Sequence, residues 1–201
     1  MTVRGKGPDR VHTSDDRGDV LQRLATALER VEALLPPATP PDFGSAIAFR
    51  WRKRRYLGME RGSLEAVVHP ALIAFDDLHH VGTQKEAIRR NTEQFVRGLP
   101  ANNVLLTGAR GTGKSSLIRA CLHAFARDGL RLVEVDKRDL VDLAELVALL
   151  EGRPERFIVF CDDLSFDASE AGYKELKAAL DGSVAGRADN VLVYATSNRR
   201  H

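Results

Sequence analysis

Gly108-Ala109-Arg110-Gly111-Thr112-Gly113-Lys114-Ser115 is the most informative stretch of this 201-residue sequence. It matches the pattern G-x-x-x-x-G-K-[ST] at every fixed position. The glycines let the backbone approach phosphate groups closely, and the N–H groups that open the following helix supply an anion site. We expect Lys114 to reach the β- and γ-phosphates of a nucleotide, and the Ser115 hydroxyl to ligate Mg²⁺. The predicted nucleotide-binding residues are Gly108, Ala109, Arg110, Gly111, Thr112, Gly113, Lys114, Ser115 and Ser116.

Residues 108–115 are called the phosphate loop below. The residues on both sides of this loop have the pattern that a strand–loop–helix unit requires. Residues 104–107 are a short apolar run, typical of a buried strand. After Lys114, apolar residues recur at helical spacing until Gly129. This context disfavours the alternative, a glycine-rich turn that matches the pattern by chance.

Strands and helices alternate along the C-terminal two thirds of the chain, which predicts a parallel sheet covered by helices on both faces. Strands are expected at residues 104–107, 130–135, 157–161 and 191–195. Helices are expected at residues 83–96, after the phosphate loop, at 139–150, and from Ser169 onward. The strand at 157–161 is apolar throughout, as a strand buried on both faces should be.

Two acids follow that apolar strand directly, Asp162 and Asp163. An apolar strand ending in two acids is the Walker B arrangement, in which the first acid holds Mg²⁺ and the second orients or deprotonates water. We therefore expect Asp162 to help hold Mg²⁺ through a bound water, beside the Ser115 hydroxyl, and Asp163 to polarise the attacking water. The alternative is an acidic surface turn. The position one strand–helix–strand unit after the phosphate loop favours the catalytic interpretation.

The strand at 191–195 leads into polar residues that we expect beside the γ-phosphate. Asn198 is the favoured candidate for holding the attacking water between itself and Asp163. Thr196 and Ser197 are alternatives, because predicted strand ends are uncertain by a residue or two. The predicted catalytic residues are therefore Lys114, Asp163 and Asn198.

Four separated segments, GARGTGKSS, FIVFCDDLSF, LKAALDG and YATSNRRH, together resemble an uncharacterised bacterial family of AAA+ P-loop ATPases known only as a domain of unknown function. The broader resemblance to AAA+ ATPases covers residues from about 70 to 201. It implies a three-layer α/β/α P-loop NTPase core, with strands 1–4 of a parallel sheet ordered 5-1-4-3-2. It also implies ATP and Mg²⁺ as ligands, residues 78–82 near the adenine, and hydrolysis at the interface of a homo-oligomer.

Two departures from the superfamily pattern accompany this resemblance. Most members have Asp-Glu where this chain has Asp162-Asp163, so the second carboxylate lies one methylene closer to the backbone. The fifth strand, the arginine finger and the helical lid have no counterpart before His201. We therefore expect the core at 70–201 to be incomplete at its C-terminus, with the phosphate-loop strand at the sheet edge, and ATP hydrolysis to be weak.

Residues 1–69 are predicted to be an N-terminal appendage. It comprises a disordered start over 1–13, an amphipathic helix from Asp19 that packs on its own domain or on a partner, a Pro-rich linker over 36–44, and a basic-aromatic segment. That segment, at 49–56, has five basic and three aromatic residues and no acid. The stretch from Arg50 to Tyr56 either contacts nucleic acid, with rings stacked on bases, or is a solvated helix face with a buried Trp51.

The composition suits a globular protein, with 43% hydrophobic and 29% charged residues. A net charge of +2 is too small to indicate nucleic-acid binding by itself. Cys121 and Cys161 lie in apolar runs, so we expect them to be core residues of a protein in a reducing compartment. The sequence has neither an apolar stretch of membrane-spanning length nor a signal-peptide core, so we expect a cytoplasmic protein without membrane contact.

Together these features favour an ATP-binding and ATP-hydrolysing AAA+ module that couples nucleotide state to the remodelling or loading of a macromolecule. One alternative is a P-loop small-molecule kinase, which would need an acceptor pocket and a lid. Another is a non-hydrolysing module, in which ATP orders the fold or an oligomer. A GTPase is disfavoured because no Asn-Lys-x-Asp segment is present. The sequence does not identify the client macromolecule.

Overall fold

The computed structural model describes residues 13–32, 41–56, 59–79, 82–164 and 188–198. Three predictions lie mainly or wholly outside these ranges. They are the disordered start, most of the Pro-rich linker, and the helix from Ser169.

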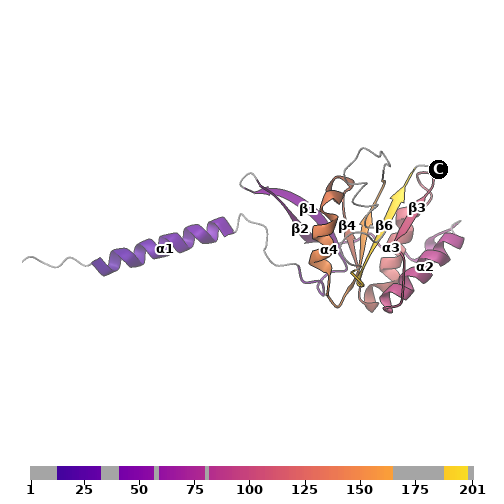
Figure 1. The fold of residues 1–201 in the computed structure, drawn as a ribbon, viewed down its shortest axis with the longest axis horizontal. Coiled ribbons are helices and arrows are strands. Elements are labelled where there is room, and N and C mark those ends of the chain that lie inside the picture. The colour runs from indigo at the N-terminus through magenta and orange to yellow at the C-terminus, as the bar shows by residue number, and fades with distance from the viewer. Residues whose placement is uncertain (1–12, 33–40, 57–58, 80–81, 165–187, 199–201) are drawn as a thin grey trace, which may run out of the picture.

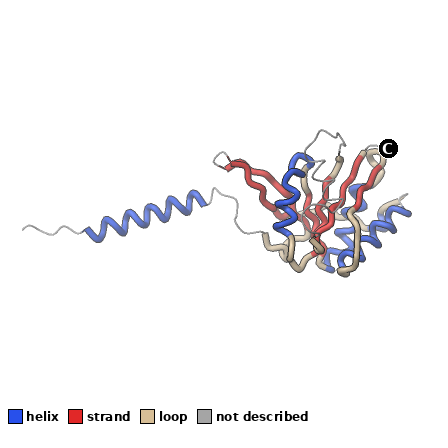
Figure 2. Tube along the Cα trace, viewed as in Figure 1, coloured by secondary structure: helices blue, strands red, loops and turns tan. Residues whose placement is uncertain are grey.

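A six-stranded sheet lies at the centre of the described residues, and its strands are red in Figure 2. The strands are β1 (Ala48–Tyr56), β2 (Met59–Ala66), β3 (Val104–Thr107), β4 (Leu130–Glu134), β5 (Arg156–Cys161) and β6 (Val191–Ser197). Their order across the sheet is β2-β1-β4-β5-β6-β3. All neighbours pair in parallel except β1 and β2, which are antiparallel. The run from β4 to β3 has the predicted order of strands 2, 3, 4 and 1, and the phosphate-loop strand β3 is terminal in this sheet.

Helices cover both faces of the sheet, which gives the predicted three layers (Figure 1). On one face lie α2 (Gly82–Val96) and α3 (Lys114–Phe125), together with the short helices η1 (Phe75–Asp77), which precedes α2, and η2 (Ala126–Asp128), which follows α3. On the other lie η3 (Lys137–Asp142) and α4 (Leu143–Leu150). Helix α4 buries Leu143, Leu146 and Leu150, spaced three and four residues apart, against the sheet. The apolar strand β5 is buried from Phe157 to Cys161, between the two helical layers.

The basic-aromatic segment is a strand, so the interpretation as a helix face was wrong. Alternate residues Phe49 and Trp51 turn into the core under α4 and are 0% and 2% exposed. The indole Nε1 of Trp51 donates to Oδ2 of Asp142 at 3.2 Å. Burying two aromatic side chains on one face outweighs the helical potential of the intervening arginines. Because β1 pairs with β4, the sheet extends across the predicted boundary between residues 69 and 70.

The predicted amphipathic helix is present as α1 (Thr13–Glu32), which begins six residues earlier than expected. Figure 1 shows it standing apart from the sheet and its helices. Its large apolar side chains are correspondingly exposed: Val20, Leu21, Leu24, Leu28 and Val31. No helix within the described ranges is both long and apolar enough to cross a bilayer.

Both cysteines are buried core residues, as predicted. Burial raises the pKa of the Cys121 thiol and of the Cys161 thiol to about 12. Since the thiolate is the reactive form, neither side chain is suited to nucleophilic chemistry near neutral pH.

Gly62 on β2 allows the Trp51 ring to reach its buried position. A Cβ atom at Gly62 would lie 1.8 Å from Cζ2 of Trp51, well inside van der Waals contact. We predict that Gly62→Ala lowers the free energy of unfolding by about 1–3 kcal/mol, because the ring must shift in a packed core. Urea denaturation measures this change. Gly82→Ala is the matched control, since nothing lies within 4 Å of a Cβ there. Equal stability of Gly62→Ala and the parent chain would contradict this account of the packing.

Candidate functional site

The carboxyl ends of β3, β5 and β6 meet at one edge of the sheet. Parallel pairing aligns Thr107 with Ser197, and Cys161 with Ala195. The backbone N–H of Gly108 donates to the carbonyl of Ser197 at 3.2 Å, which extends the β3–β6 pairing into the loop. The phosphate loop, the acid pair and the polar end of β6 therefore lie side by side, as the sequence predicted.

The phosphate loop takes the conformation that its glycines permit. Gly111 and Gly113 have φ angles of 81° and 83°, in the left-handed region that other residues rarely adopt. Gly113 caps the N-terminus of α3, and its carbonyl accepts the Leu117 N–H at 2.9 Å. The Thr112 hydroxyl closes the loop by donating to the Ala109 carbonyl at 2.8 Å. The loop thus ends at the positive end of a twelve-residue helix, where an anion is stabilised.

The Lys114 side chain folds back over this loop. Its Nζ donates to the carbonyls of Gly108 and Ala109 and to Oδ1 of Asn198, each at 2.9 Å. Lys114 is only 9% exposed, and none of the ion pairs within the described ranges includes it. A buried ammonium group that has only neutral acceptors lacks a counter-charge. Glycine loops and helix N-termini are places where phosphate groups bind. A phosphate at this position would supply the missing negative charge.

Asp162 and Ser115, the predicted metal ligands, are in direct contact. The Ser115 hydroxyl donates to Oδ1 of Asp162 at 2.7 Å, and the Thr196 hydroxyl donates to the same oxygen. Hydroxyl and carboxylate oxygens suit Mg²⁺, which is usually held by one or two carboxylates together with substrate phosphates and water. The described residues contain no cluster of three or more His, Cys, Asp or Glu side chains that could enclose a metal. This donor set therefore fits Mg²⁺ bound jointly with a nucleotide.

Asn198 joins the second acid to the lysine. Its Nδ2 donates to Oδ1 of Asp163, while its Oδ1 accepts from Nζ of Lys114. Asp163 itself has a φ of 55°, and its backbone N–H donates to the Thr196 hydroxyl at 2.9 Å. The three predicted catalytic residues thus form one continuous chain of hydrogen bonds at the sheet edge.

The two alternatives to Asn198 have different surroundings. Thr196 and Ser197 are 1% and 0% exposed, and their hydroxyls bond within the protein. Ser197 donates to the carbonyl of Leu164, whereas Thr196 holds both acids of the pair. Asn198 is the exposed member of the three. The sequence did not reveal the double contact of Thr196, which depends on the register between β5 and β6.

The segment expected near the adenine is only partly described, and its role stays a prediction. Leu78 is buried in the hydrophobic cluster beneath α3, and residues 80–81 of the segment expected near the adenine are outside the described ranges. The rings of Phe49 and Trp51 are buried in the core, so they cannot stack on bases. The basic-aromatic segment is not part of the site formed around Lys114.

A family model described as "Protein of unknown function (DUF815)" matches residues 44–201. The chain belongs to this family. The predicted membership of a family known only as a domain of unknown function is thereby confirmed, and the DUF815 match includes β1 and β2 as well as the predicted core. Among curated protein sequences, none matches the chain significantly.

Solved structures with a similar fold include three named proteins. DnaA from Aquifex aeolicus bound to AMPPCP is 16% identical, with a TM-score of 0.45 over 63% of this chain and 42% of that one. The ORC1 protein of Aeropyrum pernix in complex with DNA is 16% identical, with a TM-score of 0.45 over 65% and 40%. PCH-2 from C. elegans is 16% identical, with a TM-score of 0.43 over 92% and 64%. This DUF815 chain spans between 40% and 64% of the length of these proteins, and similarity at this level assigns it no ligand or partner.

We predict that Thr196→Val lowers the free energy of unfolding by about 1–3 kcal/mol. Valine keeps the shape of threonine but leaves the Asp163 N–H without its acceptor. Denaturant titration measures the loss, and Thr196→Ser, which keeps the hydroxyl, is the matched control. If Thr196→Ser were the less stable variant, the methyl group and not the hydroxyl would be the stabilising part of this side chain.

Proposed function

We propose that this chain binds ATP together with Mg²⁺ at residues 108–116 and hydrolyses it. The observation that carries the proposal is the buried ammonium of Lys114, which has three neutral acceptors and lies beside the Ser115–Asp162 pair. That combination matches a polyphosphate and a hard divalent cation at the same time. The chain of hydrogen bonds from Lys114 through Asn198 to Asp163 favours hydrolysis over simple binding.

In this proposal each residue has a distinct role in ATP binding or hydrolysis. The loop N–H groups and Lys114 hold the phosphates and neutralise charge that develops on them. Ser115 and Asp162 hold Mg²⁺, which when bound supplies further charge neutralisation. Asp163 accepts a proton from water or orients it, and Asn198 fixes the direction of that carboxylate. The Thr196 hydroxyl fixes the positions of the two acids, because it donates to the Asp162 carboxylate and accepts from the Asp163 N–H.

The wider role of the protein is part of the same proposal. We infer a cytoplasmic AAA+ module that assembles with further copies of itself and uses nucleotide state to remodel or load a macromolecule. The α/β/α core and membership of the DUF815 family support this inference.

We predict that Lys114→Ala weakens ATP binding at least about 30-fold, the effect of removing one partner from a buried charge-assisted contact. Isothermal titration calorimetry with ATP and Mg²⁺ measures the affinity. Lys137→Ala, which removes an exposed lysine of η3, is the matched control and should bind as the parent does. ATP binding that survives Lys114→Ala unchanged would place the nucleotide elsewhere.

We predict that Asp163→Asn retains ATP binding but lowers phosphate release by about 100-fold or more, because the general-base carboxylate is lost. Asparagine tolerates the left-handed backbone at this position, so the substitution removes charge without forcing the loop to move. A coupled phosphate-release assay measures turnover, with Asp128→Asn on η2 as the control. Turnover that does not depend on Asp163 would contradict this role, and phosphate transferred to an added small molecule instead of water would indicate a kinase.

A further inference from the structure

The β1–β2 hairpin concentrates positive charge that the chain as a whole lacks. Residues 49–65 contain six basic and two acidic side chains, a net charge of +4, whereas the complete chain has a net charge of +2. The remaining residues therefore have a small net negative charge of −2. The positive charge is therefore a property of this hairpin and not of the whole protein, which indicates a function specific to the hairpin.

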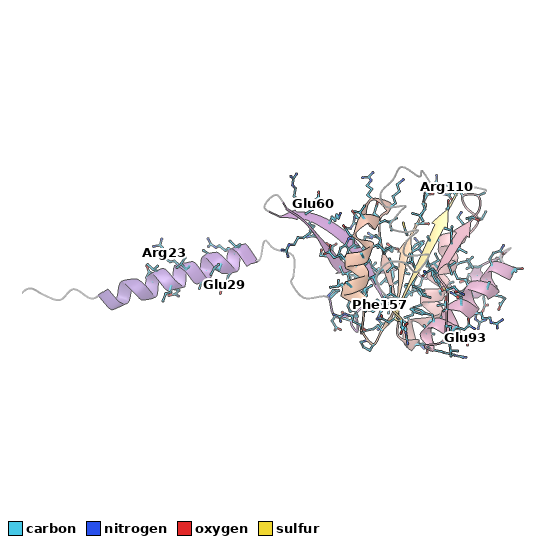
Figure 3. All side chains as sticks on the ribbon, in the orientation of Figure 1. Arg23, Glu29, Glu60, Glu93, Arg110 and Phe157 are labelled. Atoms are coloured by element: carbon cyan, nitrogen blue, oxygen red, sulfur yellow. The ribbon has the colours of Figure 1, made fainter. Side chains whose placement is uncertain are left out.

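Most of this hairpin projects beyond the sheet. Only residues 48–50 of β1 pair with β4, and the last of these pairs, Arg50 with Glu134, coincides with the end of β4. Residues 51–56 of β1 pair with β2 alone, so they form a two-stranded arm. Because β1 runs parallel to β4, the arm leaves the sheet at the edge that carries the phosphate loop. Figure 3 shows Glu60 on the arm and Arg110 of the loop at this common edge.

The alternation of β1 places arginines together on one face of the arm. Arg50, Arg52 and Arg54 share that face, and Arg61 of β2 lies directly opposite Arg54. The other face is used for packing, since Trp51 is buried there and Lys53 forms an ion pair with Asp142 at 2.9 Å. The hydrogen bond that Lys53 donates to Asp142 correspondingly raises the pKa of Lys53. The arm thus has a structural face and an arginine face.

Acidic neighbours neutralise only part of the arginine face. Arg50 pairs with Glu134 at 2.7 Å, and Arg54 pairs with Glu65. Arg52 and Arg61 are exposed, and neither belongs to an ion pair among the residues that the structure describes. Like charges directly opposite each other in a sheet, such as Arg54 and Arg61, are destabilising. An anion bound across this face would relieve that repulsion.

We propose that the arginine face of this arm docks on the phosphate backbone of duplex DNA. Side chains that bind a single strand usually include exposed aromatic rings on which bases stack. Phe49 and Trp51 are both buried, so neither ring can stack on bases, and the arginine face offers guanidinium groups to contact phosphates. A two-stranded β-ribbon fits the major groove of B-DNA, whereas the major groove of an RNA duplex is too narrow for side chains to read. Such contacts carry little sequence specificity but depend strongly on salt.

The test is fluorescence anisotropy of the full chain with a labelled duplex of about 30 base pairs, at salt concentrations from about 50 to 200 mM. Arg52→Gln/Arg61→Gln removes the two arginines of the arginine face that belong to no ion pair among the described residues. Arg89→Gln/Arg90→Gln, on the exposed side of α2, removes the same charge elsewhere and is the matched control. Arg52→Lys/Arg61→Lys keeps the charge, and far-UV circular dichroism with ATP binding confirms that each variant is folded.

We expect the parent chain to bind duplex DNA, with an affinity that falls as salt rises. Arg52→Gln/Arg61→Gln should bind about tenfold more weakly or worse, with a salt slope reduced by about two. The α2 control and the lysine variant should stay near the parent affinity. Three results would each overturn the proposal: no binding at low salt, equal losses in the arm and α2 variants, or tighter binding of single-stranded DNA or duplex RNA. ATP binding at Lys114 is measured separately, so failure here leaves the proposed ATPase untouched.

Discussion

Parallel hydrogen bonding among β5, β6 and β3 is the constraint on which the candidate site depends. The register that aligns Cys161 with Ala195 brings Asp162 against the hydroxyl of Thr196, and the register of β3 on β6 brings the phosphate loop against Asn198. A shift of one residue would turn every side chain of a strand to the opposite face. Such a shift is resisted because β5 is buried between both helical layers. The hydrophobic core, more than the loop itself, therefore maintains the geometry of the polar site.

The second feature that organises this edge is the unbalanced charge of Lys114. Removing an ammonium group from water costs several kcal/mol, and hydrogen bonds to neutral oxygens recover only part of that cost. Two of these oxygens belong to the loop and the third to Asn198, which also contacts Asp163. Under the proposed function, a movement of Lys114 toward a phosphate would release the carbonyl of Asn198, whose amide also contacts Asp163.

The sequence predicted the parts of the structure that local patterns determine. The helical spacing after Lys114 and the unbroken apolar run before Asp162 each indicated one element without reference to distant residues. The β1–β2 hairpin was not predicted, because the burial of Trp51 depends on Asp142, 91 residues away in sequence, and on the absence of a side chain at Gly62. The role of Thr196 was hidden for a similar reason, since it arises from the pairing of two strands.

The backbone at Asp163 explains why aspartate suits the position where most AAA+ proteins have glutamate. Among the described residues it is the one non-glycine residue with a positive φ, at 55°. Short polar side chains such as aspartate tolerate this region best, and the left-handed conformation costs other residues roughly 1–2 kcal/mol. The turned backbone directs its N–H to Thr196, while the short side chain meets the amide of Asn198. A glutamate would reach one methylene further but would strain this turn and extend past Asn198. Aspartate at position 163 therefore fits both the left-handed backbone there and the contact with the Asn198 amide. It need not be regarded as a glutamate that has lost a methylene group.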